Sequence, residues 1–123
     1  MKFFKCEHCG NIVAYVENKG VPVMCCGKKM TELVPNTTEA ATEKHLPVIT
    51  KNENGTVEIV VGSALHPMLP EHFIGWVAIE TKEGCQRKPL AGEPKVSFSL
   101  TETDSLVAAY AYCNLHGLWK TEA

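Results

Sequence analysis

The chain has 123 residues, 45% of them hydrophobic and 21% charged, and a formal net charge of −2. This is typical of a folded protein with one ordinary domain, or one small domain after a metal-stabilised module, and it excludes general disorder. The charge gives no basic surface for nucleic acid, and no apolar run reaches the roughly 18–20 residues that a membrane span requires. The first residues lack a signal-peptide hydrophobic region, so we expect a cytoplasmic protein.

Residues 1–35 are expected to form a small lobe that a metal ion holds together. Short strand-like runs alternate with turn residues, and the few apolar side chains cannot make a core of their own. The runs lie at residues 3–5, 11–16 and 21–24. Gly10, Gly20 and Gly27 lie close to the cysteines, where they give the backbone freedom to curl around an ion.

Four cysteines of this lobe have the spacing of a tetrathiolate metal site. Cys6-x2-Cys9 brings two thiolates to one ion from a tight turn. The adjacent Cys25 and Cys26 complete a tetrahedron, which we expect to be distorted because neighbouring side chains must splay sharply. Zinc and iron both suit such a site. His8 is expected to be exposed, not a ligand, and disulfides are disfavoured because there is no secretion signal and adjacent cysteines rarely bridge each other.

The rest of the chain is predicted to be an all-β domain that follows a short linker. Residues 36–44 read as this linker with one helical turn, for which Asn36 and Glu39 fit a weak capping pattern. Asn54-Gly55 between two apolar runs predicts a β-hairpin. The strand-like runs lie at residues 48–49, 57–61, 73–79, 96–100, 106–112 and 118–120. About seven short strands predict an antiparallel β-sandwich of immunoglobulin-like type over residues 45–123.

Four histidines and one cysteine of this domain form a second candidate metal site. They are His45, His66, His72, Cys113 and His116. One thiolate and four imidazoles would make a square-pyramidal site with one axial position open, and these ligands point to iron, copper or zinc rather than calcium or magnesium. A blue-copper site would use two histidines, one cysteine and a methionine such as Met68, which leaves two histidines unexplained.

These motifs together resemble those of the desulfoferrodoxins, the two-iron class of superoxide reductases. The quoted pattern is Cys6-x2-Cys9-x15-Cys25-Cys26, Glu43-Lys44-His45, His66-Pro67-Met68-x3-His72 and Cys113-Asn114-x-His116-Gly117. The resemblance covers essentially the whole chain and implies a desulforedoxin-like N-terminal lobe. It implies two non-haem iron ions per chain, one on the four thiolates and one with the histidines equatorial and Cys113 axial. Cys85 belongs to neither motif and reads as a buried small hydrophobe or a spare thiol.

The resemblance also implies an activity, the one-electron reduction of superoxide to hydrogen peroxide. Lys44 would attract superoxide and help to protonate the peroxide, and Glu43 would close the ferric iron's open position at rest. Family members are homodimers that take electrons from rubredoxin or a similar carrier. The N-terminal iron either relays electrons or is structural. Two other readings stay open, an electron-transfer protein without substrate turnover and a zinc-ribbon adaptor with incidental histidines.

Overall fold

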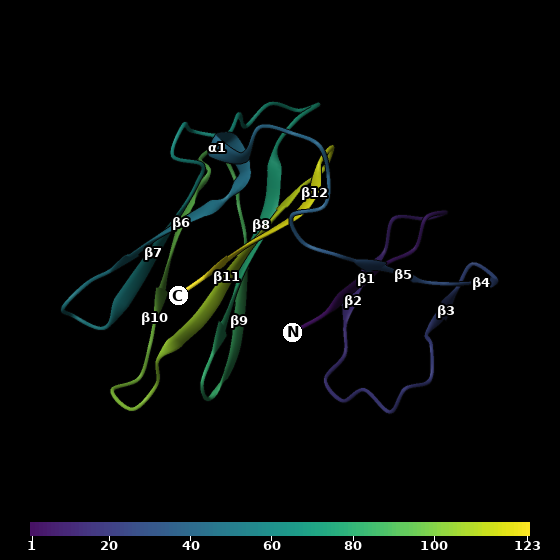
Figure 1. Cartoon of the computed structure of the whole chain (residues 1–123), viewed down its shortest axis with the longest axis horizontal. Coiled ribbons are helices and arrows are strands. Elements are labelled where there is room, and N and C mark those ends of the chain that lie inside the picture. Colours follow the sequence, from purple (N-terminus) through teal and green to yellow (C-terminus); the bar gives the residue numbers. More distant parts are fainter. The chain divides into compact units, whose positions relative to one another are not determined.

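A computed structural model describes residues 1–123, which divide into two compact units, Met1–Val34 and Pro35–Ala123. Nearly all of the regular structure is β and every strand pair is antiparallel, which confirms the predicted fold class (Figure 1). No helix in the structure combines the length and the apolar character that crossing a membrane would need.

The N-terminal unit consists of a small sheet and a separate hairpin. The sheet has the order β2-β1-β5, with β1 at Phe3–Lys5, β2 at Ile12–Ala14 and β5 at Thr31–Leu33. The hairpin pairs β3 (Met24–Cys25) with β4 (Lys28–Lys29). Of the expected run at residues 21–24 only Met24 is in a strand. The buried apolar residues of this unit are Phe3, Cys6 and Met30, which fits a lobe with little core.

The C-terminal unit is a seven-stranded sandwich of two sheets. One sheet has the order β10-β7-β6 and the other β12-β11-β8-β9. The strands are β6 (Pro47–Lys51), β7 (Thr56–Val61), β8 (Ile74–Thr81), β9 (Gly84–Pro89), β10 (Lys95–Ser99), β11 (Leu106–Cys113) and β12 (Gly117–Glu122). Every second residue of β7 is buried, because successive side chains of a strand point to opposite faces. Val57, Ile59 and Val61 thus face the core, where they join Phe98 of β10 and apolar residues of β8 and β11.

Three local expectations need correction. The helical turn is α1, Thr42–His45, and Asn36 does not cap it: its backbone has a φ of 61° and its side chain binds the backbone of Lys120 in β12. The hairpin at Asn54-Gly55 forms, but its loop spans residues 52–55 and only Gly55 has a positive φ. Strand β9 was missed because its exposed sequence, GCQRKP, has no apolar alternation.

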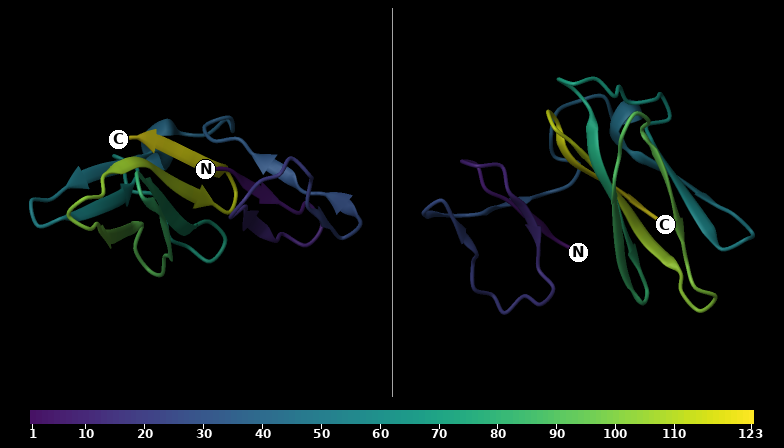
Figure 2. Two further views of the ribbon diagram at one scale, coloured as in Figure 1. Left: turned by 90° about the horizontal axis from the view of Figure 1, so that it is seen from below. Right: turned by 180° about the vertical axis from the view of Figure 1, so that it is seen from behind.

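The chain segments that carry the histidines lie at one end of the sandwich. In Figures 1 and 2, α1, the loop after β7 and the turn between β11 and β12 lie at this end, and the hairpins β6–β7 and β8–β9 turn at the other. The fold therefore brings together ligands that are up to 71 residues apart in the sequence.

Candidate metal centres

The first pair of cysteines lies in the turn between β1 and β2. The amide of Cys6 donates to the carbonyl of Asn11 (2.8 Å) and the amide of Gly10 donates to the carbonyl of Cys6 (2.9 Å), so the turn folds back on itself. The amide of Cys9 points at Cys6 Sγ (3.5 Å). This turn presents both thiols on one side and supplies a backbone donor that favours a thiolate.

The adjacent cysteines fit one site because of an unusual turn. Cys26 and Gly27 form the two-residue loop of the β3–β4 hairpin, and both have positive φ, 52° and 76°. This is the conformation of a type I′ turn, which rarely holds a side chain larger than asparagine. It lets neighbouring side chains converge, so that the Sγ atoms of Cys6, Cys9, Cys25 and Cys26 all lie within 4.8 Å of one another.

The four thiols differ in how readily they ionise, because ionisation of one thiol opposes that of its close neighbours. The backbone amide of Cys9 is the main cause that lowers the pKa of Cys6 to about 6. The pKa of Cys26 rises to about 12, because its thiol hydrogen-bonds to Cys9 and Cys6. A bound cation removes this opposition and lets all four ionise. The donor set therefore fits a tetrahedral iron or zinc ion, while His8 is exposed and outside the cluster.

The four predicted histidines of the second site form a square. Neighbouring rings lie with their centroids 4.7 Å (His45–His66), 4.6 Å (His66–His72), 5.1 Å (His72–His116) and 4.9 Å (His45–His116) apart. The diagonal from His45 to His72 is longer, 6.3 Å. Neighbouring rings meet nearly at right angles, so four imidazoles surround one point as equatorial ligands would.

Hydrogen bonds turn two of these rings toward the centre. Nδ1 of His45 lies 2.7 Å from the carbonyl of Ala41, and Nδ1 of His66 lies 2.7 Å from the carbonyl of Pro67. Because a carbonyl can only accept, each Nδ1 carries the hydrogen and each Nε2 keeps a free lone pair. Such bonds to the outer nitrogen are usual for histidines that bind metal.

The inner nitrogens have the properties of metal ligands. Nε2 of His66 and of His72 are buried without a hydrogen-bond partner. Nε2 of His45 faces Nδ1 of His116 at 3.1 Å. Burial lowers the pKa of His45, and it lowers that of His66 to about 4, so both rings are neutral at pH 7. Converging nitrogens, two of them buried without a hydrogen-bond partner, fit a cation at the centre of the square.

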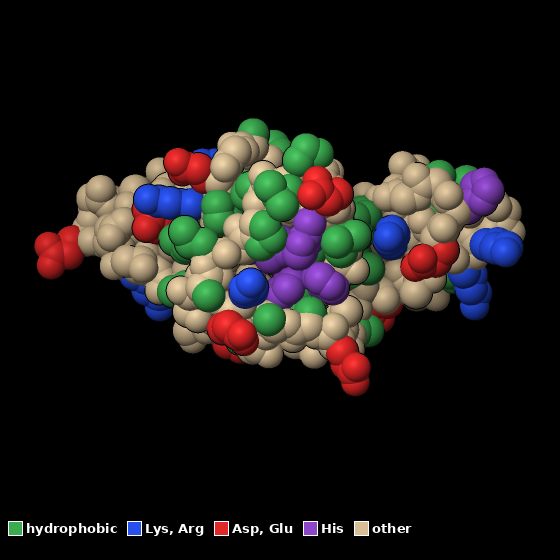
Figure 3. All heavy atoms as spheres, turned by 90° about the horizontal axis from the view of Figure 1, so that it is seen from above, with side chains coloured by type: hydrophobic (Ala, Val, Ile, Leu, Met, Phe, Trp, Pro, Cys, Tyr) green, Lys and Arg blue, Asp and Glu red, His purple; other side chains and the backbone are tan.

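Cys113 supplies the fifth donor from the core side. Its side chain is fully buried in the hydrophobic core, and its Sγ lies within 4.8 Å of the donor atoms of His45, His66 and His72, and 3.8 Å from Nδ1 of His116. The opposite side of the square faces outward, and Figure 3 shows histidines at the surface, with hydrophobic side chains around them and a basic side chain beside them. Five donors and one outward side match the predicted square-pyramidal site.

Met68 does not belong to this centre, which removes the main support for a blue-copper site. Its Sδ accepts a hydrogen bond from the amide of Ile74 (3.4 Å), and the side chain packs against the core. Cys85 lies on β9 and is exposed, so its reading as a buried hydrophobe was wrong and the thiol is spare.

Three residues that the sequence did not single out hold the ligand segments in place. The side chain of Asn114 accepts from the amide of Phe73 (2.8 Å) and donates to the carbonyl of Glu71 (3.0 Å), which ties the loop of His72 to that of Cys113. Gly62, at a φ of 87°, lies directly against the carbonyls of Glu43 and Lys44. Trp119 contacts His45 and His116. Of these three residues, only Asn114 has a signal in the sequence, which is its position inside the cysteine–histidine motif.

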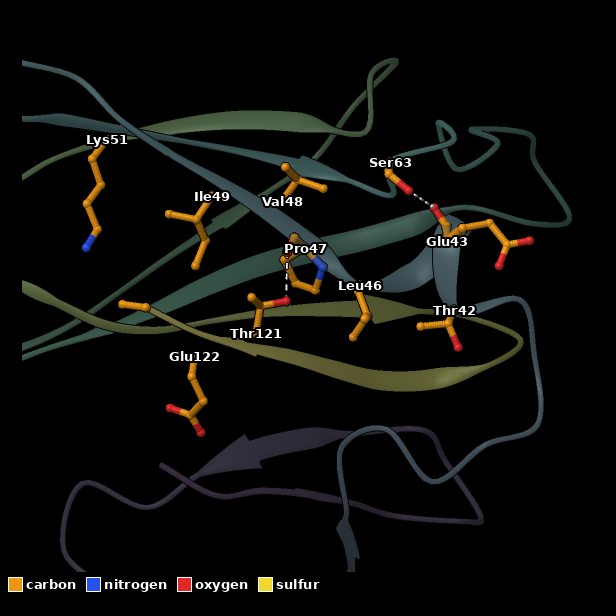
Figure 4. Close-up of a pocket in the computed structure, with 11 residues that line it drawn as sticks. Thr42, Glu43, Leu46, Pro47, Val48, Ile49, Lys51, Ser63, Thr121 and Glu122 are labelled. Carbon is orange, nitrogen blue, oxygen red and sulfur yellow. Dashed lines mark hydrogen bonds between the residues drawn. The ribbon is translucent and has the colours of Figure 1, made fainter.

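Glu43 and Lys44 lie beside the centre in α1, both with exposed side chains. The carbonyl of Glu43 accepts from the amide of Ala64 (2.9 Å) and from the hydroxyl of Ser63 (3.3 Å), which fastens α1 to the loop of His66. The carboxylate of Glu43 is not among the clustered donor atoms. It lies at one end of an open groove of about 830 Å³, with Lys51 at the other end (Figure 4). No histidine lines this groove, so it is separate from the metal centre.

Comparison with known proteins agrees with both sites. A family model described as desulfoferrodoxin matches residues 37–122, and one described as its N-terminal domain matches residues 1–33. A desulfoferrodoxin from Syntrophotalea carbinolica is 41% identical over 99% of this chain and 96% of its own. A superoxide reductase from Pyrococcus horikoshii is 38% identical over 65% of this chain and 85% of its own. The crystal structure of the superoxide reductase from Treponema pallidum covers 98% of both chains at 37% identity and a TM-score of 0.83.

The two family matches divide the chain as its two compact units do, and relatives match nearly its whole length. The geometry of the two centres agrees with these matches. The chain belongs to the desulfoferrodoxin family.

Proposed function

We propose that the chain is a superoxide reductase, which combines superoxide, one electron and two protons into one hydrogen peroxide. The observation that carries this is the square of four imidazoles with a buried thiol on its core side and its other side toward the surface. The relatives from Pyrococcus horikoshii and Treponema pallidum, which bear this activity in their names, support it. A small anion needs no deep cavity, only an accessible position opposite the thiol.

The residues that would hold iron at the second centre are His45, His66, His72, Cys113 and His116, and the four cysteines would hold iron at the first. When bound there, iron would supply the one-electron redox chemistry that the reduction needs. Cys113 would hold the iron as an anionic thiolate and donate electron density to it, as the thiolate does in cysteine-ligated haem. Its full burial keeps water from the sulfur. Imidazoles bind a metal ion in their neutral form and would add no charge, so the outward position stays attractive to an anion.

Lys44 and Glu43 are proposed to serve the outward position. Lys44 supplies local positive charge in a chain of net charge −2, which attracts superoxide. Its ammonium group can donate hydrogen bonds to the bound oxygens and pass on a proton. Glu43 is proposed to turn its exposed carboxylate to this position at rest and to leave it when substrate arrives. The placement of both residues in α1, directly before the ligand His45, supports these roles.

Other parts of the proposal concern the surroundings of the protein. The oxidised centre must regain one electron per turnover, for which we propose a rubredoxin-like carrier, with the N-terminal iron as either a relay or a structural element. We propose a homodimer, which suits an N-terminal unit with so few buried apolar residues. A cytoplasmic location fits five cysteines that must remain reduced to bind metal.

The thiolate argument can be tested with a matched pair of cysteine variants. Cys113→Ser should lower the rate of oxidation by superoxide more than about 100-fold, beyond the 10–100-fold typical of residues that only support a ligand. Cys85→Ser replaces an exposed thiol outside both centres and should keep the wild-type rate. The measurement is the oxidation of the anaerobically reduced centre, followed by absorbance after a pulse of superoxide. A Cys113→Ser protein that reacts as fast as Cys85→Ser would contradict the proposal.

A further inference from the structure

Trp119 lies against two of the metal ligands. It follows the ligand turn on β12, pairs with Ala111 of β11 and is 3% exposed. Its indole ring stacks on the ring of His45, with centroids 4.8 Å apart and planes at 28°. Its Nε1 hydrogen is donated to the carbonyl of His116 over 3.1 Å. One side chain therefore links a ligand from α1 to a ligand from the β11–β12 turn.

The stacking has an electrostatic consequence. An imidazole bound to a metal ion takes on part of the positive charge of that ion. Tryptophan has the aromatic face that best stabilises a cation, and the effect grows when the pair is shielded from water. Because the ferric ion carries one more positive charge than the ferrous ion, stacking against His45 should favour the ferric state. Trp119 would then lower the reduction potential of the centre.

The hydrogen bond has a geometric consequence. The turn that carries His116 closes at Gly117, whose φ is 77°, opposite Cys113. By binding the carbonyl of His116, the indole holds this turn while its ring holds His45, and these two ligands have the facing nitrogens 3.1 Å apart. We therefore propose that Trp119 is a positioning residue for the four-histidine centre, which lowers the potential of its iron and slows iron release. This rests on the proposed use of iron there, but not on superoxide as the substrate.

Two substitutions separate the two contacts, and a third provides the control. Trp119→Phe keeps an aromatic ring and removes the N–H donor, whereas Trp119→Leu removes both. Trp76→Phe is the matched control, because Trp76 lies on β8 and stacks on Tyr112 (5.5 Å between centroids, 7° between planes). The readouts are the midpoint potential of the four-histidine iron in a redox titration, the ferric EPR spectrum, and the rate of ferrous iron transfer to a chelator. None of them involves superoxide.

We expect a graded result. The midpoint potential should rise in Trp119→Phe and rise further in Trp119→Leu, with an altered ferric EPR signal in both. Iron transfer should be about 10–100-fold faster in Trp119→Leu, the range typical of residues that support a metal ligand. Trp76→Phe should match the wild type in all three readouts.

Some results would overturn the proposal. The proposal is wrong if Trp119→Phe has the same midpoint potential and EPR signal as the wild type and Trp76→Phe. This test holds even if Trp119→Leu fails to fold. A fall in potential would overturn the electrostatic argument directly. If the wild-type protein does not react with superoxide but the Trp119 variants show the expected changes in potential and EPR signal, only the proposed function is contradicted.

Discussion

At the scale of single residues, the chemistry of the C-terminal centre depends on which nitrogen of each imidazole carries a hydrogen. The carbonyls of Ala41 and Pro67 fix this for His45 and His66 by accepting from Nδ1. His116 differs, because its Nδ1 is the nitrogen that faces the centre. At His45 and His66 the backbone therefore selects the ligand atom before any ion binds, which reduces the reorganisation needed to form the site.

Lys44 is the residue whose charge should matter most for the encounter with substrate. Lys44→Ala should slow the second-order reaction with superoxide about tenfold, the lower end of what electrostatic steering provides, and should flatten its dependence on salt. Lys51→Ala is the control, since Lys51 is exposed at the far end of the groove from Glu43 (Figure 4). The measurement is the rate at several ionic strengths, and equal salt slopes for both variants would remove Lys44 from the mechanism.

At the scale of elements, the single turn of α1 is held by backbone hydrogen bonds from the segment that follows β7. Gly62 donates to the carbonyl of Leu46, and Ala64 donates to that of Glu43. A Cβ at Gly62 would lie 2.8 Å and 2.9 Å from the carbonyl oxygens of Lys44 and Glu43, and closer still to that of Ala64. These are backbone atoms, so the element itself would have to move.

Gly62→Ala should therefore disturb both stability and the metal centre. Forcing a side chain into this backbone conformation costs about 1–3 kcal/mol, and the shift of α1 should displace Glu43, Lys44 and His45. Denaturant unfolding measures the first effect, and the EPR spectrum of the C-terminal iron measures the second. Gly84→Ala is the control, since its Cβ would meet open space. Equal stability and equal spectra for the two variants would show that α1 is not held as described.

Sequence patterns predicted the strands of the sandwich that supply buried apolar side chains and missed the one that is exposed. β7 and β11 carry apolar side chains that the core demands, so their position follows from the sequence. β9 is an exposed edge strand whose pairing with β8 is set by the fold and not by burial. The helical turn also depends on distant contacts with the loop after β7, which no local capping pattern reveals.

The candidate ligands could be predicted from the sequence, whereas the backbone contacts that bring them together could not. The pattern of cysteines and histidines singled out nine candidate ligands, and the structure brings their donor atoms together in two clusters. The convergence of Cys25 and Cys26 depends on a positive φ at Cys26, a backbone state that its residue type does not suggest. Asn114 joins segments that are 41 residues apart in the chain. The contact of Trp119 with His116 depends on how β12 pairs with β11.

At the scale of the whole molecule, each unit carries its own complete set of ligands. Cys6 to Cys26 lie within Met1–Val34, and His45 to His116 lie within Pro35–Ala123. No ligand of one centre comes from the other unit, so metal binding at each centre can be disturbed separately. The zinc-ribbon reading treats the four histidines as incidental. It leaves their buried, unpartnered nitrogens without the binding partner that such atoms normally have.

Cys26→Ser tests this independence. It should abolish or strongly alter the absorption of the tetrathiolate iron, because the ligand set loses one of its four sulfurs. The EPR spectrum of the C-terminal iron and its rate of oxidation by superoxide should remain within about twofold of the wild type, since second-site changes at a distance are nearly additive. Cys85→Ser should leave both centres unchanged. A matching loss at the C-terminal centre in Cys26→Ser would show that the two units act as one.

The central claim, that this protein reduces superoxide, is tested most directly by its products. Superoxide is pulsed into anaerobically reduced, iron-loaded protein, and peroxide, dioxygen and the oxidation state of the C-terminal iron are measured together. We predict one peroxide for each superoxide consumed, one oxidised C-terminal iron for each peroxide, and no dioxygen. Dioxygen with half as much peroxide would mean dismutation, and no reaction would mean an electron carrier; either result would contradict the account.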